Sequence, residues 1–270
     1  MTKTEPNIEK LYEENLKFWD DAWQRVSKPH KELPKLPYIH EITRKLKKFR
    51  VKKILDLGCG SGWLSIFMSK YGFEITGIDT SKSAIELGTV WAKEDNANIN
   101  LVAGDLLNLP FEDGSFDAVV CNSVLEHFRF DQAKIIFNTV HKVLADGGFF
   151  FGCFDQVGSG KGEYFELPDH THVYTDQMRK GMMLRNYSDQ ELKELLSNFD
   201  ILSFDKNNYG SRLVWAKKKY LWKQIISWAK RKWLLSGDIY WSFGSKFFWI
   251  KNFCNRRHDP FNNCIKSSAR

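Results

Sequence analysis

Apolar runs and amphipathic stretches alternate through the middle of the chain. Short apolar runs, each ending at a polar residue or a turn, predict strands at 54–57, 73–79, 99–105, 118–121 and 149–154. Apolar residues at helical spacing predict helices at 63–68, 83–93 and 131–144. Strands that alternate with helices in this way favour an α/β fold built on a parallel sheet.

The sheet is expected to end in an antiparallel hairpin. Two further apolar runs, 200–205 and 212–216, are joined by Asn207-Asn208-Tyr209-Gly210, a connection that suits a tight turn. Ahead of them, Ser188 and Glu191 have the spacing of a capping box and predict a helix over 190–196. Before the first strand, two loosely helical patterns cover 7–27 and 39–49.

A glycine-rich turn follows the first strand. Gly58, Gly60 and Gly62 alternate after Asp56 and lead directly into a helix. Glycines at such a turn let a ligand approach the unpaired N–H groups of the helix start. The dinucleotide fingerprint G-x-G-x-x-G would require glycine at Trp63, so the turn does not match that fingerprint. A carboxylate at the strand end would also repel a pyrophosphate and attract a cationic ligand.

Three successive strands end in a carboxylate. They are Asp56, then Asp79, 21 residues beyond Gly58, and then Asp105. Thr80 and Ser81 are available to cap the helix after Asp79, which leaves that carboxylate free to accept the hydroxyls of a ribose. Since open α/β sheets bind ligands at the carboxyl ends of their strands, this repeated placement is more specific than any one motif.

With these features the sequence resembles the class I S-adenosylmethionine-dependent methyltransferases of the small-molecule type, whose first motif has the acidic-x-Gly-x-Gly-x-Gly form. The bridge at 109–117 is also typical of that family. The resemblance spans roughly 39–218 and implies S-adenosyl-L-methionine as cofactor. It implies cofactor contacts from Asp56, Gly58, Cys59, Gly60, Asp79, Thr80, Asp105, Leu106 and Asn122. Asp105 would accept the adenine amino group in that arrangement.

The N-terminal helix has two interpretations. In the resembling family, N-terminal helices often cover the cofactor or the substrate entrance, and Tyr12, Trp19 and Trp23 could serve as such a lid. Aromatic residues at helical spacing are, however, more often packed against the body of a domain, and we favour packing.

His127 is the candidate general base. Methyl transfer mainly requires the acceptor to be held in line behind the methyl group, with a base only where the acceptor loses a proton. His127 follows the fourth strand, where the acceptor is expected, and its ordinary pKa suits proton removal. The alternative is that Glu126-His127 orders the loop or contacts the cofactor. Some quinone-biosynthesis methyltransferases resemble this Leu-Glu-His stretch, which keeps a lipophilic phenol among the acceptors.

The segment 155–187 has little periodicity and is expected to be an acceptor loop. Its Gly158-Ser159-Gly160-Lys161-Gly162 run lacks phosphate-loop spacing and is interpreted as a hinge. A metal held by Asp169, His170 and His172 would need a further ligand from a distant part of the chain, so we predict no metal site. Substrate contacts from His170, His172, Tyr174 or Arg179 are expected instead.

Composition places the chain among intracellular globular proteins. It has 270 residues and is 43% hydrophobic, enough for one α/β core with extensions. Cys59, Cys121, Cys153, Cys254 and Cys264 form no C-x-x-C pair, which favours reduced thiols. No apolar run is long enough to cross a bilayer and the start of the chain lacks a signal region, so a cytoplasmic location is expected.

The positive charge is concentrated at the end of the chain. Residues 217–270 contain thirteen Lys or Arg against two Asp, so this tail carries +11 and the remainder −4. Its basic residues are interleaved with Trp and Phe, an amphipathic helical pattern covers 219–235, and 239–253 adds further aromatic residues. This combination favours an anionic membrane surface as partner, and so a peripheral position on the inner membrane surface. Packing on the domain and nucleic-acid binding remain alternatives.

Together these features predict a Rossmann-like, seven-stranded, mostly parallel sheet with a terminal antiparallel hairpin and helices on both faces. The expected domains are an N-terminal helical cap at 1–38, a methyltransferase domain at 39–218 and a helical C-terminal extension at 219–270. The expected function is methyl transfer to a small acceptor, lipophilic or membrane-linked. The alternatives are an RNA or tRNA methyltransferase docked through the tail, and a non-catalytic S-adenosylmethionine-binding regulatory module.

Overall fold

The computed structural model describes residues 7–27, 36, 38–155, 162–207 and 210–219, together with the backbone of 239–243 and 246–250. The chain forms two compact units, Met1–Lys219 and Tyr220–Arg270. In the described part of the second unit, β11 (Ile239–Phe243) and β12 (Lys246–Ile250) pair as an antiparallel ribbon. The helical prediction for this stretch is therefore wrong, and its part at 220–238 lies outside the described residues.

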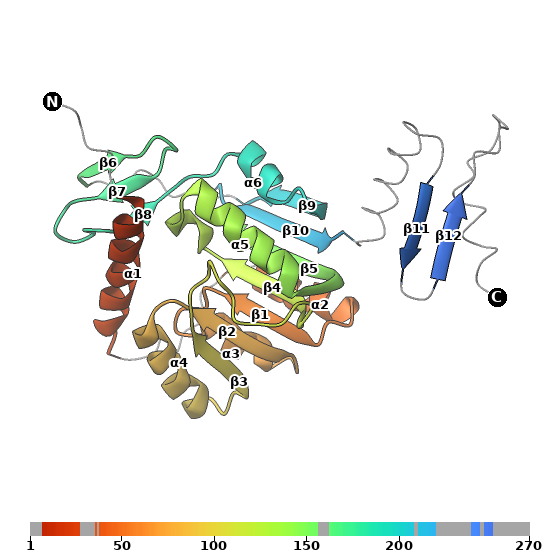
Figure 1. Ribbon diagram of the computed structural model, residues 1–270. Helices are drawn as coiled ribbons and strands as arrows, with labels where there is room; N and C mark the ends of the chain where they lie inside the picture. The colour runs from red at the N-terminus through yellow and green to blue at the C-terminus, as the bar shows by residue number, and fades with distance from the viewer. Residues whose placement is uncertain are drawn as a thin grey trace. The chain divides into compact units, whose positions relative to one another are not determined.

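A seven-stranded sheet forms the centre of the first unit, in the order β3-β2-β1-β4-β5-β10-β9 (Figure 1). The five strands from β3 to β5 run parallel, and β10 runs antiparallel to both of its neighbours. The predicted fold is thereby confirmed. The strands are β1 (Lys53–Leu57), β2 (Glu74–Asp79), β3 (Ile99–Ala103), β4 (Phe116–Asn122), β5 (Leu144–Phe154), β9 (Phe199–Lys206) and β10 (Arg212–Lys218).

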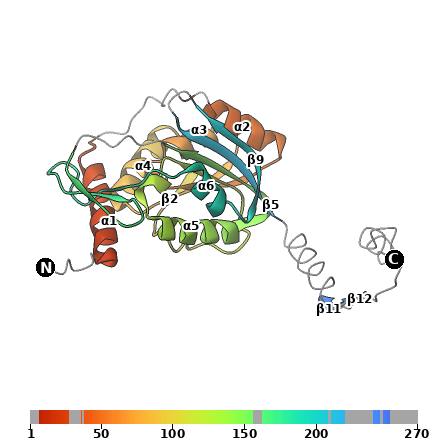
Figure 2. The same cartoon turned by 90° about the horizontal axis from the view of Figure 1, so that it is seen from above.

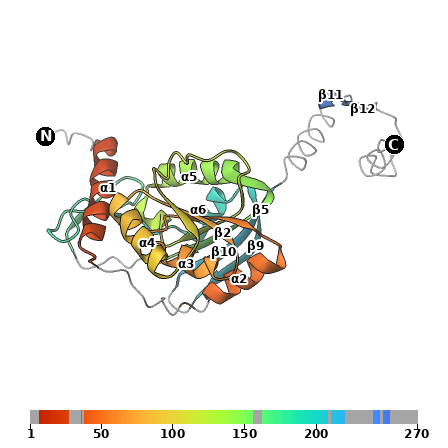
Figure 3. The same cartoon turned by 90° about the horizontal axis from the view of Figure 1, so that it is seen from below.

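Helices cover both faces of the sheet (Figures 2 and 3). One face buries α5 (Phe130–Val143) and α6 (Asp189–Leu195) through residues such as Ile136, Val140 and Leu192. The other face buries α2 (Tyr38–Lys48) and α3 (Trp63–Ser69) through Ile42 and Phe67. The predicted capping box at the start of α6 is confirmed, because Ser188 and Glu191 bond reciprocally to each other's backbone. Between β4 and α5, Leu125–His127 forms the short helix η1.

The helix α4 (Lys82–Glu94) packs very closely on the glycine turn. A Cβ atom added to Gly88 would stand 2.7 Å from the carbonyl oxygen of Ser61, so only glycine allows this approach. The contact sets the distance between α4 and the turn that follows β1.

We expect Gly88→Ala to lower the free energy of unfolding by about 1–2 kcal/mol. Alanine would favour the helix by about 1 kcal/mol, but overpacking against a backbone atom typically costs more. Chemical denaturation would measure the change. Glu86→Ala, at an exposed position on the same helix, is the control and should stay within about 0.5 kcal/mol of the parent. An unchanged denaturation midpoint for Gly88→Ala would show that the turn accommodates the added methyl group without loss of stability.

A second, small sheet lies within the predicted acceptor loop, where the sequence indicates only irregular chain. Its strands β6 (Tyr164–Glu166), β7 (His172–Tyr174) and β8 (Met183–Leu184) pair antiparallel. The strands have two or three residues each, too short to show a period in the sequence. Leu11 of α1 (Ile8–Gln24) packs on this sheet with Leu167, Val173 and Met183.

Candidate active site

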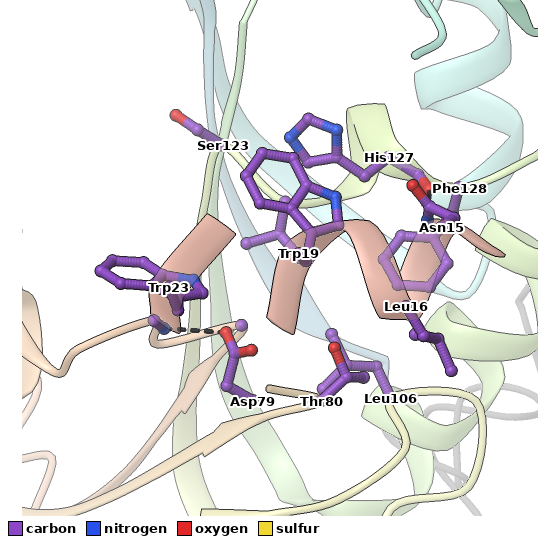
Figure 4. A pocket seen from close by; sticks show the side chains of 13 residues that line it. Asn15, Leu16, Trp19, Trp23, Asp79, Thr80, Leu106, Ser123, His127 and Phe128 are labelled. Atoms are coloured by element: carbon purple, nitrogen blue, oxygen red, sulfur yellow. Dashed lines mark hydrogen bonds between the residues drawn. The ribbon is translucent and has the colours of Figure 1, made fainter. Parts of the chain in front are cut away.

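A cavity of about 120 Å³ lies at the carboxyl ends of β1, β2 and β4, beneath α1 (Figure 4). The ends of β1 and β2 supply one side of the cavity, η1 supplies the opposite side, and α1 lies over both. The lining residues are Asn15, Leu16, Trp19, Trp23, Gly58, Gly60, Asp79, Thr80, Leu106, Ser123, Val124, His127 and Phe128. Five of the nine predicted cofactor contacts are in this list, as is the predicted base.

Asp79 ties the glycine turn to the start of α4. Its Oδ2 accepts the Gly60 N–H at 2.8 Å and its Oδ1 accepts the Ser81 N–H at 2.9 Å. Ser81 caps α4 as predicted, with its side chain accepting from the Ala84 N–H. The sequence predicts that the Asp79 carboxylate is free for a ribose. In the structure it instead accepts hydrogen bonds from two backbone N–H groups. Burial raises the pKa of Asp79, and the hydrogen bonds from the turn partly offset this effect.

The turn itself requires glycine for two separate reasons. Gly58, Gly60 and Gly62 all have positive φ, at 69°, 53° and 75°. Space is also short, because a Cβ atom on Gly58 would stand 2.5 Å from Val124 and one on Gly60 would stand 2.8 Å from the Trp23 ring. The backbone of the turn is therefore in direct contact with the cavity and with α1.

Asp56 does not line the cavity and acts from beneath the turn. It is 2% exposed, and its Oδ2 accepts the Ser65 hydroxyl of α3 at 2.7 Å. Burial raises the pKa of Asp56 to about 7. The hydrogen bond from Ser65 lowers this pKa, but by less than burial raises it. Asp56 therefore joins β1 to the helix that follows the turn.

The pH dependence of stability tests this environment. Between about pH 4 and 7 folded Asp56 keeps a proton that the unfolded chain, with a pKa of 3.8, has already lost, so stability falls as pH rises. We expect Asp56→Asn to remove a decline of up to about 1.4 kcal/mol per pH unit in that range. Urea denaturation of both proteins at several pH values would measure it. Parallel curves for the two proteins would contradict the assignment.

Three other predicted cofactor residues lie outside the cavity lining. The thiol of Cys59 is buried against Gly77, beneath the turn. The Oδ1 atom of Asp105 accepts the Tyr12 hydroxyl at 2.8 Å, and the Oδ1 atom of Asn122 accepts the Tyr38 hydroxyl at 2.7 Å. Tyr12 and Tyr38 are thus the partners of these two side chains in this structure.

His127 lies on the cavity wall opposite Asp79 (Figure 4). Its Nδ1 atom is 3.2 Å from the carbonyl oxygen of Met183. Because a carbonyl only accepts, Nδ1 carries the proton and Nε2 is left as an acceptor. Burial lowers the pKa of His127 to about 4, so the imidazole is neutral at physiological pH. The indole of Trp19 packs edge-on against the imidazole at 4.3 Å.

The helix α1 covers the cavity, and its aromatic residues also pack on the domain, as the preferred interpretation predicts: Tyr12 packs against the main core and Trp19 against the cluster around Tyr174. Trp19 and Trp23 both line the cavity. Asp20 on the same helix accepts the Ser81 hydroxyl at 2.8 Å and the Ser83 N–H at 3.1 Å, at the start of α4. Asn15 and Asp20 were not predicted from the sequence. The aromatic spacing was the available signal for the lid, but no local pattern marks these two polar residues.

The residues expected to contact substrate from the 155–187 segment lie away from the cavity lining. His170 is exposed beside Glu166, and the His172 ring stacks on Tyr164 at 4.1 Å. Tyr174 is buried with the guanidinium of Arg179 over its ring. The predicted hinge at 158–162 lies almost wholly outside the described residues. Within the described residues no group of His, Cys, Asp or Glu is arranged to hold a metal.

The buried thiols agree with the expectation drawn from cysteine spacing. Cys59, Cys121 and Cys153 are buried and unpaired. Burial raises the pKa of the Cys59 and Cys121 thiols well above the usual range, and that of Cys153 to about 12. They are protonated core residues, not nucleophiles. Cys254 and Cys264 lie outside the described residues.

Comparison with known proteins connects the site to a chemistry. A family model described as a methyltransferase domain matches residues 54–148. The ubiquinone biosynthesis O-methyltransferase of Coxiella burnetii (strain CbuK_Q154) is 30% identical over 194 residues, which cover 66% of this chain and 80% of the relative. The protein of the same name from Rickettsia akari is 31% identical over 153 residues, covering 53% and 60%.

Solved structures share the fold. A crystal structure of a Pyrococcus horikoshii OT3 protein covers 74% of this chain and 99% of its own, with a TM-score of 0.61 and 23% identity. Magnesium protoporphyrin IX methyltransferase from Synechocystis PCC 6803, solved with bound S-adenosylhomocysteine, covers 75% and 97%, with a TM-score of 0.55 and 18% identity.

Proposed function

The chain belongs to the class I S-adenosylmethionine-dependent methyltransferases, and on that premise we propose that it methylates a hydroxyl oxygen of a small, lipophilic acceptor. S-Adenosyl-L-methionine is the cofactor of this family. The residues at the strand ends fit it: a turn without Cβ atoms at Gly58 and Gly60, the carboxylate of Asp79, and the apolar Leu106. When bound, the cofactor supplies a methyl group on a sulfonium that leaves as a neutral thioether.

The observation that carries the proposal is the state of His127. Its Nδ1 proton is committed to the Met183 carbonyl, so Nε2 is available on the cavity wall to accept a proton. A hydroxyl that gains a methyl group becomes a strong acid at its oxygen, so even a base with a pKa of about 4 can take the proton as the C–O bond forms. His127 therefore suits a hydroxyl acceptor, which loses its proton as it gains the methyl group.

The character of the acceptor follows from the rest of the wall. Leu16, Trp19, Val124 and Phe128 line the same cavity as His127 and give it apolar surface. Such a wall favours a flat or aliphatic molecule over a charged one. The names of the Coxiella and Rickettsia relatives, with transfer to oxygen in ubiquinone biosynthesis, support the same choice.

The test is transfer of isotope-labelled methyl from S-adenosylmethionine into separated lipid, small-metabolite and RNA fractions. We expect label in an organic-extractable small molecule, at a position that chemical analysis identifies as an ether. Label in RNA would contradict the proposal and favour an RNA methyltransferase. Binding of the cofactor with no label in any fraction would favour a non-catalytic module.

We propose in addition that residues 219–270 bind an anionic membrane surface, since they contain eleven Lys or Arg against two Asp, among many Trp and Phe residues. Among the described residues no helix is long and apolar enough to cross a bilayer. Cosedimentation with vesicles containing phosphatidylglycerol should retain the full chain and not a chain ending at Lys218. Equal sedimentation of both would remove the proposal.

A further inference from the structure

Asn15, His127 and Met183 form a closed ring of three hydrogen bonds at the cavity. The Asn15 side-chain amide donates to the His127 carbonyl oxygen at 3.0 Å. The Met183 N–H donates to Asn15 Oδ1 at 2.9 Å, and His127 Nδ1 donates to the Met183 carbonyl oxygen at 3.2 Å. Asn15 is 1% exposed, so these bonds do not compete with water. The ring joins α1, η1 and β8.

The pairing of the small sheet leaves the N–H and C=O groups of Met183 free to form this ring of hydrogen bonds. The strand β8 pairs with β7 on one side, and both polar backbone groups of Met183 are used outside the sheet, by Asn15 and by His127. Two further contacts keep the parts in register. The Arg185 N–H donates to the Glu126 carbonyl oxygen at 2.7 Å, and a Cβ atom on Gly181 would stand 2.9 Å from the Glu14 carbonyl oxygen of α1. The helix α1 therefore sits tightly against the segment that leads into β8.

We infer that Asn15 is a positioning residue that makes the orientation of the His127 imidazole depend on the seating of α1. The inference rests on the proposed role of His127 as proton acceptor. The side-chain amide of Asn15 donates to the His127 carbonyl and accepts from the Met183 N–H at the same time, which neither an apolar side chain nor a carboxylate can do. If α1 lifts or Asn15 is removed, both backbone groups lose their partner, and the Met183 carbonyl is no longer held against Nδ1.

The consequence falls on the tautomer. While the Met183 carbonyl is fixed, the proton stays on Nδ1 and Nε2 faces the cavity as an acceptor. Once the carbonyl moves, the imidazole can carry its proton on Nε2 and can no longer take one from the substrate. Base function is thus restricted to the state in which α1 covers the site.

The test uses the full chain labelled with ¹⁵N-histidine, and long-range ¹H–¹⁵N correlation spectra of the His127 ring, which need no substrate. We expect the Nδ1–H tautomer in the parent protein. We expect Asn15→Ala to show a mixture of tautomers and a kcat lowered about 100-fold, the cost of misplacing a reacting group by about 1 Å. Asn15→Asp is nearly isosteric and keeps an acceptor for the Met183 N–H but no donor for the His127 carbonyl, so an intermediate effect is expected.

Lys17→Ala, on an exposed side of the same helix, should change neither readout. The inference is overturned if the His127 tautomer in Asn15→Asp and Asn15→Ala matches the parent, whatever happens to the rate, because Asn15 would then only pack α1. If Asn15→Ala does not fold, Asn15→Asp decides alone. Two experiments separate this inference from the proposed role of His127 as base. Full turnover by a His127 variant would remove that role, while the effect of Asn15 on the His127 tautomer would be measured independently of it.

Discussion

Replacing His127 with alanine should lower kcat for methyl transfer about 10²- to 10⁴-fold, the usual contribution of a positioned proton acceptor. The dissociation constant of S-adenosylmethionine should change little, because the imidazole lies on the wall opposite Asp79. Turnover with a labelled methyl donor and titration calorimetry with the donor alone would separate the two quantities. Unchanged turnover would remove His127 as the base.

His127→Asn is the matched variant for this experiment. Its side-chain amide can still donate to the Met183 carbonyl in place of Nδ1, but it offers no acceptor where Nε2 lies. It should therefore be as slow as the alanine variant while folding normally. In the parent protein the rate should be constant above about pH 5.5 and decline toward pH 4, since burial lowers the pKa of His127 to about 4. A decline centred near pH 6.5 would indicate an imidazole of ordinary pKa.

Replacing Asp79 with alanine should weaken binding of S-adenosylmethionine at least about 100-fold. The carboxylate accepts the N–H groups of Gly60 and Ser81, and hydrogen bonds to a charged group contribute about 1.5–3 kcal/mol each. Without it the glycine turn loses its tie to α4, and the ribose loses its expected acceptor. Titration calorimetry with S-adenosylmethionine and with S-adenosylhomocysteine would measure the loss.

Asp79→Asn serves as the comparison, because the amide keeps one acceptor of the same shape. Its loss of affinity should be smaller than that of the alanine variant. Circular dichroism of all three proteins would verify that the sheet is intact. Affinity within threefold of the parent for Asp79→Ala would contradict the prediction, because neither the bonds from Asp79 to the turn nor a contact with the ribose would then contribute to cofactor binding.

The parallel sheet, and the residues that its strand ends contribute to the cavity, could be predicted because the sequence next to each strand specifies them. Each buried strand is a short apolar run, and Gly58, Gly60 and Asp79 follow their strands directly. Because the carboxyl ends of parallel strands meet at one edge, the position of each residue along its strand also fixes its neighbours in space. On this basis Asp79 was predicted at the edge of the sheet where the cavity lies, without reference to any distant contact, whereas Leu106 was predicted only through the family resemblance.

The side of the cavity formed by α1 and η1, where we propose that the acceptor binds, could not be predicted in the same way. Asn15 and Trp19 reach the site only because α1 docks across strand ends far along the chain, and Met183 only because three very short strands pair. The local pattern of α1 specifies an amphipathic helix but not the surface it covers. Asp105 was predicted to end the third strand, but β3 ends at Ala103, and the hydrogen bond between Asp105 and Tyr12 was not foreseen.

The hydrogen bond between Asn15 and Met183 joins residues 168 positions apart, which has a consequence for folding kinetics. Closing a loop of that length lowers the entropy of the chain before the new contact can stabilise it. The parallel sheet buries its core through β1, β2 and β4 without this contact. We therefore expect the acceptor side to become ordered in the last folding phase, on a sheet already able to hold the cofactor.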